Sequence, residues 1–197
     1  LGRRVDLTPT PVAVTLTAPT PAPAATLPPP TPIVAAAGEK LLLVAPFVGY
    51  TSEELRFNVA GRIQEALERE MGESALADVR VAVIQTPVTA QTQARGLLAQ
   101  SGASAIIWGE YDAGRVRANV TVPAGETQWI NPVDSPARLA VVINDAVPNA
   151  ARMLALYALG RLYQQEQDWS PALRTFEKAL ALQPSDTGTL ASLHFYI

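Results

Sequence analysis

The chain has 197 residues, 48% of them hydrophobic, which is enough for one domain of about 100 residues with its own core and a smaller appendage. Its formal net charge of −3 leaves no basic surplus to pair with phosphates, so nucleic acid is a poor candidate partner. With no cysteine and a single histidine, His194, it cannot form a disulfide, use a thiolate or assemble a multi-histidine metal or catalytic site. We therefore expect a protein that is not an enzyme and has no cofactor.

Residues 1–37 are predicted to be a disordered linker rich in proline, threonine and alanine. Between residues 7 and 37 lie nine of the 17 prolines, and no charge occurs there. Proline fixes φ and removes donors, so the segment favours extended, polyproline-like conformations. It could tether the chain to a membrane element outside the sequenced residues, or simply separate two domains. No uninterrupted apolar run reaches the roughly 18 residues of a membrane span, and the compartment stays open.

Residues 38–145 are predicted to form an α/β domain with a parallel or mixed sheet in two or three layers. Apolar runs alternate with segments of helical periodicity, and this order favours parallel strands joined by right-handed crossovers. We expect strands at 40–47, 79–85 and 103–109, a helix that starts at a capping box formed by Thr51 and Glu54, and a second helix at 90–100.

The C-terminal part of this domain has a different pattern. Residues 115–122 alternate strictly between apolar and polar, which predicts a strand that returns antiparallel to its predecessor and has one wet face. Trp129 is predicted to lie in a loop. The apolar run 139–143 predicts an edge strand before the helices begin near Pro148.

The segment from Ala151 to Asp186 has the spacing of a 34-residue helix-turn-helix unit. Small and large residues occur in the order that close packing of two antiparallel helices needs. These structural positions are Leu156, Leu159, Gly160, Tyr163, Ala172, Phe176, Ala179 and Pro184. The pattern resembles the tetratricopeptide repeat (TPR), and the alternative is an ordinary amphipathic helical hairpin. Residues 148–197 would then hold one full repeat and the start of a second at 189–197.

The turn of this unit departs from the TPR pattern at one position. Where the repeat has a glycine before Asp168, this chain has Gln167, which predicts a strained or altered turn. We expect the side chain of Asp168 to cap the second helix.

The TPR resemblance implies a partner-binding groove on the first helix of the unit. Its outward positions would be Leu154, Tyr157, Arg161, Gln164 and Gln165. Tyrosine and arginine often carry binding energy at interfaces. The alternatives are that these side chains face solvent or pack on the α/β domain.

Residues 40–123 resemble the N-terminal α/β domain of the TolB periplasmic protein. The resemblance depends chiefly on the strand that ends in Pro46-Phe47 and the strand that ends in Gly109-Glu110. It implies a domain that mediates association and supplies no catalytic residues.

Two functions remain in view. The first is a protein-interaction scaffold in which the α/β domain caps TPR units that bind a protein or peptide, with a homo-oligomer also possible. The second is the sensor or regulatory region of a larger bacterial signalling protein, with an NTPase or other effector domain before the linker.

Overall fold

A computed structural model describes residues 33–50, 57–74, 76–133 and 135–182. All of them belong to one of the two units into which the chain divides, Pro32–Ile197. The predicted linker up to residue 32, the residues Thr51 and Glu54, Pro184 and the second repeat at 189–197 lie outside the described residues. The prediction that the first helix starts at a capping box of Thr51 and Glu54 is wrong, because the helix begins at Val59, where the Asn58 side chain accepts from Gly61 N at 3.0 Å.

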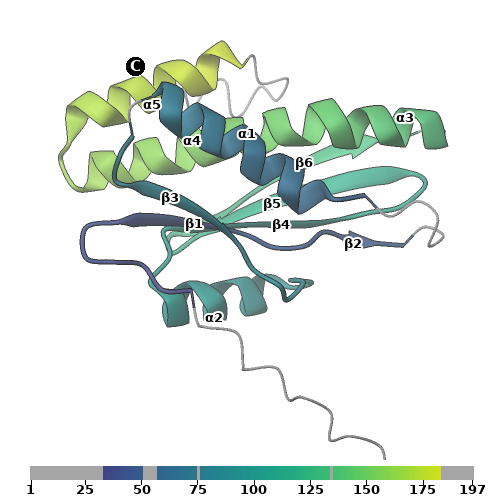
Figure 1. Ribbon diagram of the computed structural model, residues 1–197, viewed down its shortest axis with the longest axis horizontal. Coiled ribbons are helices and arrows are strands. Elements are labelled where there is room, and N and C mark those ends of the chain that lie inside the picture. The colour runs from purple at the N-terminus through teal and green to yellow at the C-terminus, as the bar shows by residue number, and fades with distance from the viewer. Residues whose placement is uncertain (1–32, 51–56, 75, 134, 183–197) are drawn as a thin grey trace, which may run out of the picture. The chain divides into compact units, whose positions relative to one another are not determined.

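The protein is a mixed α/β structure built on one six-stranded sheet (Figure 1). Its strands are β1 (Lys40–Val44), β2 (Val48–Gly49), β3 (Val79–Val83), β4 (Ala105–Tyr111), β5 (Arg115–Val122) and β6 (Gly125–Pro132). The order is β3-β1-β4-β5-β6, and β2 pairs with β4. β1 is parallel to both β3 and β4, whereas β4, β5 and β6 form an antiparallel meander. The predicted parallel strands and the antiparallel return at 115–122 are thus confirmed.

Helices cover both faces of the sheet. α2 (Gln91–Ser101) lies on one face, and α1 (Val59–Glu73) and α4 (Val147–Gln165) lie on the other (Figure 1). Alternate residues of β1 serve the two cores: Leu41 and Leu43 pack with α2, and Leu42 and Val44 pack with α1 and α4. This two-sided burial explains the continuous apolar run in the sequence.

The prediction of a wet face on β5 is wrong. Asn119 and Thr121 are both fully buried, because Trp108 and the neighbouring strand β6 surround them. The Trp108 indole donates to the Thr121 hydroxyl at 2.9 Å, and the Gln128 amide donates to Asn119 Oδ1 at 2.8 Å. Trp129 is correspondingly part of strand β6 and not of a loop.

The prediction of an edge strand at 139–143 is also wrong. α3 (Pro136–Val141), a π-helical segment (Val142–Ala146) and α4 form one continuous helix. It begins where Ser135 Oγ accepts from Arg138 N at 3.2 Å and Pro136 occupies the first turn. The π segment ends at Ala146, two residues before Pro148, which has no N–H to give to the preceding turn. By length and composition alone the helix Arg138–Gln165 could cross a membrane, but 61% of its most apolar window is buried inside the protein.

A helical hairpin follows, formed by α4 and α5 (Trp169–Ala181). A Cβ placed on Gly160 would come within 2.5 Å of the Phe176 ring, so the two helices need the small residue there. Gln167 adopts a φ of 63°, which confirms that the turn requires the conformation a glycine would adopt. The prediction for Asp168 is wrong, because its side chain makes no capping hydrogen bond.

Candidate functional site

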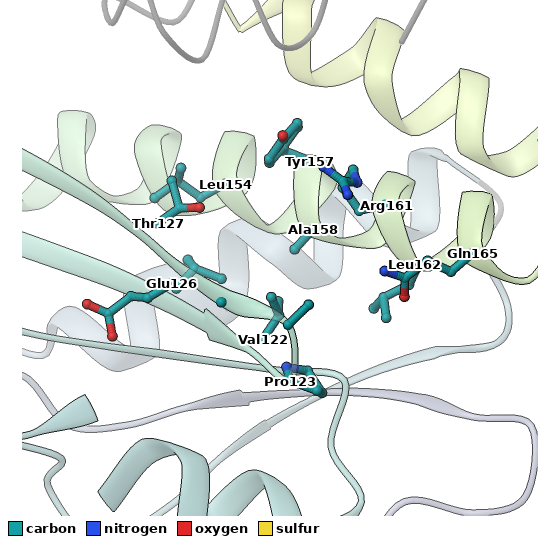
Figure 2. A pocket seen from close by; sticks show the side chains of 13 residues that line it. Val122, Pro123, Glu126, Thr127, Leu154, Tyr157, Ala158, Arg161, Leu162 and Gln165 are labelled. Carbon is teal, nitrogen blue, oxygen red and sulfur yellow. The ribbon is translucent and has the colours of Figure 1, made fainter. Parts of the chain in front are cut away.

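A pocket of about 290 Å³ lies between α4 and the β5–β6 hairpin (Figure 2). One wall consists of successive turns of α4, and the other consists of Val120, Val122 and residues 123–127 at the hairpin tip. Periodicity explains the helix wall, since residues three or four positions apart share one face of a helix. We call this site the α4 pocket.

Four of the five predicted groove residues line the α4 pocket. They are Leu154, Tyr157, Arg161 and Gln165. The fifth, Gln164, lines a separate cavity of about 220 Å³ with Trp169, Ala172, Leu173 and Phe176. Leu154 is fully buried, so the α4 face is partly packed on the sheet, as one alternative in the sequence analysis anticipated.

The chemistry of the α4 pocket suits recognition. Leu154, Ala158 and Val120 are buried and form an apolar floor. Tyr157 is held by Phe176, whose ring centroid lies 6.0 Å away at a tilt of 52°. Arg161 adds a cationic group. No group of three or more histidine, aspartate or glutamate side chains that could hold a metal occurs among the described residues.

Glu126 lines the α4 pocket through its position in the hairpin, but its carboxylate is engaged elsewhere. The Thr121 hydroxyl donates to Glu126 Oε2 at 3.1 Å and accepts from Trp108. This chain of hydrogen bonds lies on the α2 side of the sheet. Arg161 and Glu126 are the two charged residues among those that line the α4 pocket.

Two polar clusters fix α4 and α5 to the rest of the molecule. In the first, Glu70 of α1 is buried and accepts from Arg152 of α4, from Lys178 of α5 at 3.1 Å and from the Ser74 hydroxyl at 2.9 Å. Burial raises the pKa of the Glu70 carboxyl, but these donors outweigh burial and lower it overall. The cluster thus keeps an ionised carboxylate between three helices.

The second cluster joins α4 to the edge of the sheet. The Tyr163 hydroxyl donates to Asp78 Oδ1 at 2.7 Å, and Lys40 Nζ lies 3.1 Å from Asp78 Oδ2 and 4.3 Å from the Tyr163 ring centroid. Burial and the adjacent Asp78 carboxylate raise the pKa of Tyr163. Lys40 also pairs with Glu166 at 2.9 Å. Tyr163, a predicted structural position of the hairpin, therefore also docks the hairpin on the sheet.

The sequence did not predict the β5–β6 hairpin that forms the second wall of the α4 pocket. Residues 125–132 were predicted as a loop, and Pro123-Ala124 is not one of the residue pairs that typically mark a two-residue hairpin turn. Phe47 and Gly109 lie against each other in the fold. A Cβ on Gly109 would come within 2.5 Å of the Phe47 ring, so this glycine is needed for close contact.

No family model matches the chain, and no curated protein matches it. Two solved structures of the PelC dodecamer from Paraburkholderia phytofirmans, one of them a variant, align with 60% of this chain and with 89% and 93% of theirs. Their identities are 16% and 12%, each with a TM-score of 0.32. A likeness at this level carries no argument about function.

Proposed function

We propose that the chain is a non-enzymatic protein-interaction module. In this proposal the α4–α5 hairpin is a TPR unit, the TolB-like sheet caps its N-terminal side, and the α4 pocket binds a protein or peptide. The observation that carries the proposal is the convergence of Tyr157, Arg161 and Gln165 with the β5–β6 hairpin on one pocket.

The capping role is supported by the way α4 is held. Its inward residues share one hydrophobic core with α1 and with strands β1, β4 and β5. The clusters around Glu70 and Asp78 add charged hydrogen bonds at both α5 and the C-terminal end of α4. A lone helical hairpin could not bury this face, so the sheet replaces a preceding repeat.

The binding role is supported by the composition of the α4 pocket. An apolar floor with an aromatic and a guanidinium group above it is typical of sites that take an apolar anchor beside a carbonyl or carboxylate. On the side of the α4–α5 hairpin away from the α4 pocket, Trp169 and Leu173 of α5 are exposed, with 63% and 42% of their surface accessible to solvent. They leave an apolar surface on which a further helix could stack.

The proposal can be tested with a library of displayed peptides selected against the immobilised full chain. The tightest peptide is then titrated by fluorescence anisotropy. We expect Arg161→Ala and Tyr157→Ala each to weaken its affinity roughly tenfold or more, since interface tyrosine and arginine often contribute more than about 1 kcal/mol. Thr127→Arg, which narrows the α4 pocket from the strand side, should have the same effect.

Matched controls are Tyr50→Ala and Arg62→Ala, which change the same residue types at exposed positions outside the α4 pocket. These two variants should bind like the parent chain. Because Tyr157 packs on Phe176, thermal midpoints of all variants are measured alongside. Equal affinity of Arg161→Ala, Thr127→Arg and the controls would contradict the proposal.

A further inference from the structure

Phe176 of α5 lies between two cavities. Its ring packs on Tyr157, which lines the α4 pocket. The same ring lines the separate cavity of about 220 Å³, the α5 cavity, whose other lining residues are Gln164, Trp169, Ala172 and Leu173. Among the described residues, none lines both cavities. Phe176 therefore joins the α5 cavity to the wall of the α4 pocket.

The helical spacing of α4 explains this position. Tyr157, Gly160 and Gln164 follow one another at intervals of three and four residues, so they form one stripe on the helix. The Phe176 ring lies over the middle of this stripe, where a Cβ on Gly160 would come within 2.5 Å of it. Because Gly160 has no side chain, the ring can contact Tyr157 on one side and the α5 cavity, beside Gln164, on the other.

The contact with Phe176 restricts the Tyr157 side chain before a ligand binds. The two ring centroids are 6.0 Å apart with a tilt of 52°, within the range of favourable aromatic pairs. A tyrosine on a helix has more than one accessible χ1 rotamer, and each places the ring differently. Figure 2 shows Tyr157 beside Arg161 on α4. A Tyr157 ring that is already fixed reduces the entropy cost of ligand binding.

We propose that Phe176 is a positioning residue of the α4 pocket and that it transmits the packing of the α5 cavity to Tyr157. Phe176 is not among the residues that line the α4 pocket, so it acts through Tyr157. When packing around Phe176 loosens, Tyr157 loses its fixed orientation and the α4 pocket binds its ligand more weakly. This inference rests on the proposed function, because it concerns the ligand of the same site.

The positioning is measured first without a ligand. Three-bond NMR couplings report the χ1 populations of Tyr157 in the full chain labelled with ¹⁵N and ¹³C. We expect one dominant rotamer in the parent chain and an average over rotamers in Phe176→Leu, which keeps an apolar side chain but loses the ring. Identical χ1 populations of Tyr157 in these two proteins would overturn the proposal.

The effect on binding is measured with the peptide selected against the full chain. Phe176→Leu should weaken its affinity about three- to tenfold, since Tyr157 is no longer held. Tyr157→Ala should then have a smaller effect in the Phe176→Leu background than in the parent chain, because the two residues act as a unit. Equal effects of Tyr157→Ala in both backgrounds would mean that the two residues act independently, contrary to the proposal.

The link to the α5 cavity is tested from its exposed rim. Leu173 lines this cavity one helical turn before Phe176, and Leu173→Ala enlarges the space beside the Phe176 ring. We expect the χ1 populations of Tyr157 to shift towards those of Phe176→Leu and the peptide affinity to fall about two- to threefold. Val141→Ala, at an exposed apolar position on α3 that lines neither cavity, is the matched control. Leu173→Ala indistinguishable from this control would contradict the link.

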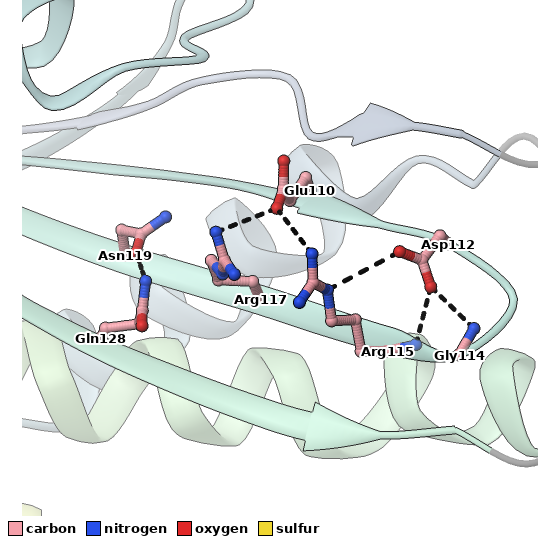
Figure 3. Close-up of polar contacts among 7 residues, drawn as sticks. All are labelled: Glu110, Asp112, Gly114, Arg115, Arg117, Asn119 and Gln128. Carbon is pink, nitrogen blue, oxygen red and sulfur yellow. Dashed lines mark hydrogen bonds and ion pairs between the residues drawn. The ribbon is translucent and has the colours of Figure 1, made fainter.

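A variant on the opposite face of the β5–β6 hairpin separates positioning from a general loss of stability. Gln128 lies on the α2 side, where its amide donates to buried Asn119 at 2.8 Å beside the ion pair of Arg117 with Glu110 (Figure 3). Gln128→Ala should lower the thermal midpoint, because Asn119 loses this donor, and leave the peptide affinity unchanged. If Gln128→Ala weakened the peptide as much as Phe176→Leu does, the positioning role of Phe176 would be refuted.

Failure of the proposed function has a different signature. If no displayed peptide binds, or if Arg161→Ala and Tyr157→Ala leave its affinity unchanged, the proposed function is wrong. The χ1 populations of Tyr157 in the parent chain, in Phe176→Leu and in Leu173→Ala need no ligand. They decide in either case whether Phe176 positions Tyr157 and whether the α5 cavity influences it.

Discussion

The hydroxyl of Tyr163 on α4 donates a 2.7 Å hydrogen bond to Asp78, the residue directly before strand β3. Tyr163 was expected to fill space inside the helical hairpin, and it is buried there. Its hydroxyl extends further and joins the hairpin to the sheet. One side chain thus serves both the proposed repeat and the proposed cap.

Tyr163→Phe should lower the free energy of unfolding by about 1–2 kcal/mol, because Asp78 loses a donor while the ring and its contact with Lys40 remain. Urea denaturation followed by circular dichroism measures the change. Tyr50→Phe removes the same hydroxyl from an exposed ring and should have no measurable effect. Equal stability of the two variants would mean that the Tyr163 hydroxyl does not help to dock α4.

Glu70→Gln should destabilise the protein by roughly 1–3 kcal/mol at neutral pH. The substitution removes a buried carboxylate and leaves Arg152 and Lys178 without their shared acceptor charge. Glu65→Gln, an exposed position on the same helix, is the matched control and should behave like the parent chain. If Glu70→Gln unfolded at the same denaturant concentration as this control, the cluster would not stabilise the three-helix contact.

The stabilising effect of Glu70 should depend on pH in a defined direction. Its folded-state pKa is lowered, because the hydrogen bonds from Arg152, Lys178 and Ser74 outweigh burial. A carboxyl of this kind contributes its full stability above its unfolded-state pKa and loses it as the pH falls through the folded-state pKa. The difference in unfolding free energy between the parent chain and Glu70→Gln should therefore shrink in acid. A difference that grew with acidification would be inconsistent with an ionised Glu70.

Gly160→Ala should lower the free energy of unfolding by about 1–3 kcal/mol, because the added methyl group meets the Phe176 ring where α4 and α5 are closest. Gly96→Ala on α2 offers a matched comparison, since its Cβ would meet nothing within 4 Å. Alanine favours helices by up to about 1 kcal/mol over glycine, so Gly96→Ala should stabilise the protein. Thermal unfolding of both variants shows whether each substitution lowers or raises stability. A stabilising Gly160→Ala would show that the helices can separate without penalty.

Gln167→Gly should stabilise the protein by about 1 kcal/mol. Gln167 has a φ of 63°, which costs a residue with a side chain roughly that amount and costs glycine little. Gln165→Gly, in the last turn of α4 with helical backbone, should instead destabilise it. Chemical denaturation of the pair is the measurement, and destabilisation by Gln167→Gly would contradict the strained-turn interpretation.

Several local features were predictable because they depend on neighbouring residues. The apolar run of β1, the alternation of β5 and the glycine after α2 each reflect a local backbone or burial period. Leu154, Tyr157, Arg161 and Gln165 were predicted together because the TPR resemblance implied them as groove positions, and they line one pocket. Gln164, which the resemblance implied in the same set, lines a different cavity.

Other features could not be predicted from neighbouring residues, because they depend on which distant element packs against the segment. The run at 139–143 is apolar enough for a strand, and a capped start at Ser135 made it helical. Asn119 and Thr121 alternate like solvent-facing residues, yet Trp108 and β6 bury them and supply their hydrogen bonds. The opposite wall of the α4 pocket was hidden for the same reason, because it belongs to a hairpin distant from α4 in sequence.

The sequence by itself determined the parallel strands β1, β3 and β4, the antiparallel return of β5, the close contact at Gly160 and the strained residue at Gln167. All of these depend on backbone stereochemistry and on residue size within a few turns of chain. Only the tertiary structure decided that α4 shares a core with the sheet, that Tyr163 reaches Asp78, and that β6 ends the sheet with an open edge. A periodic pattern shows that a side chain is buried, and the fold alone determines which distant residue buries it.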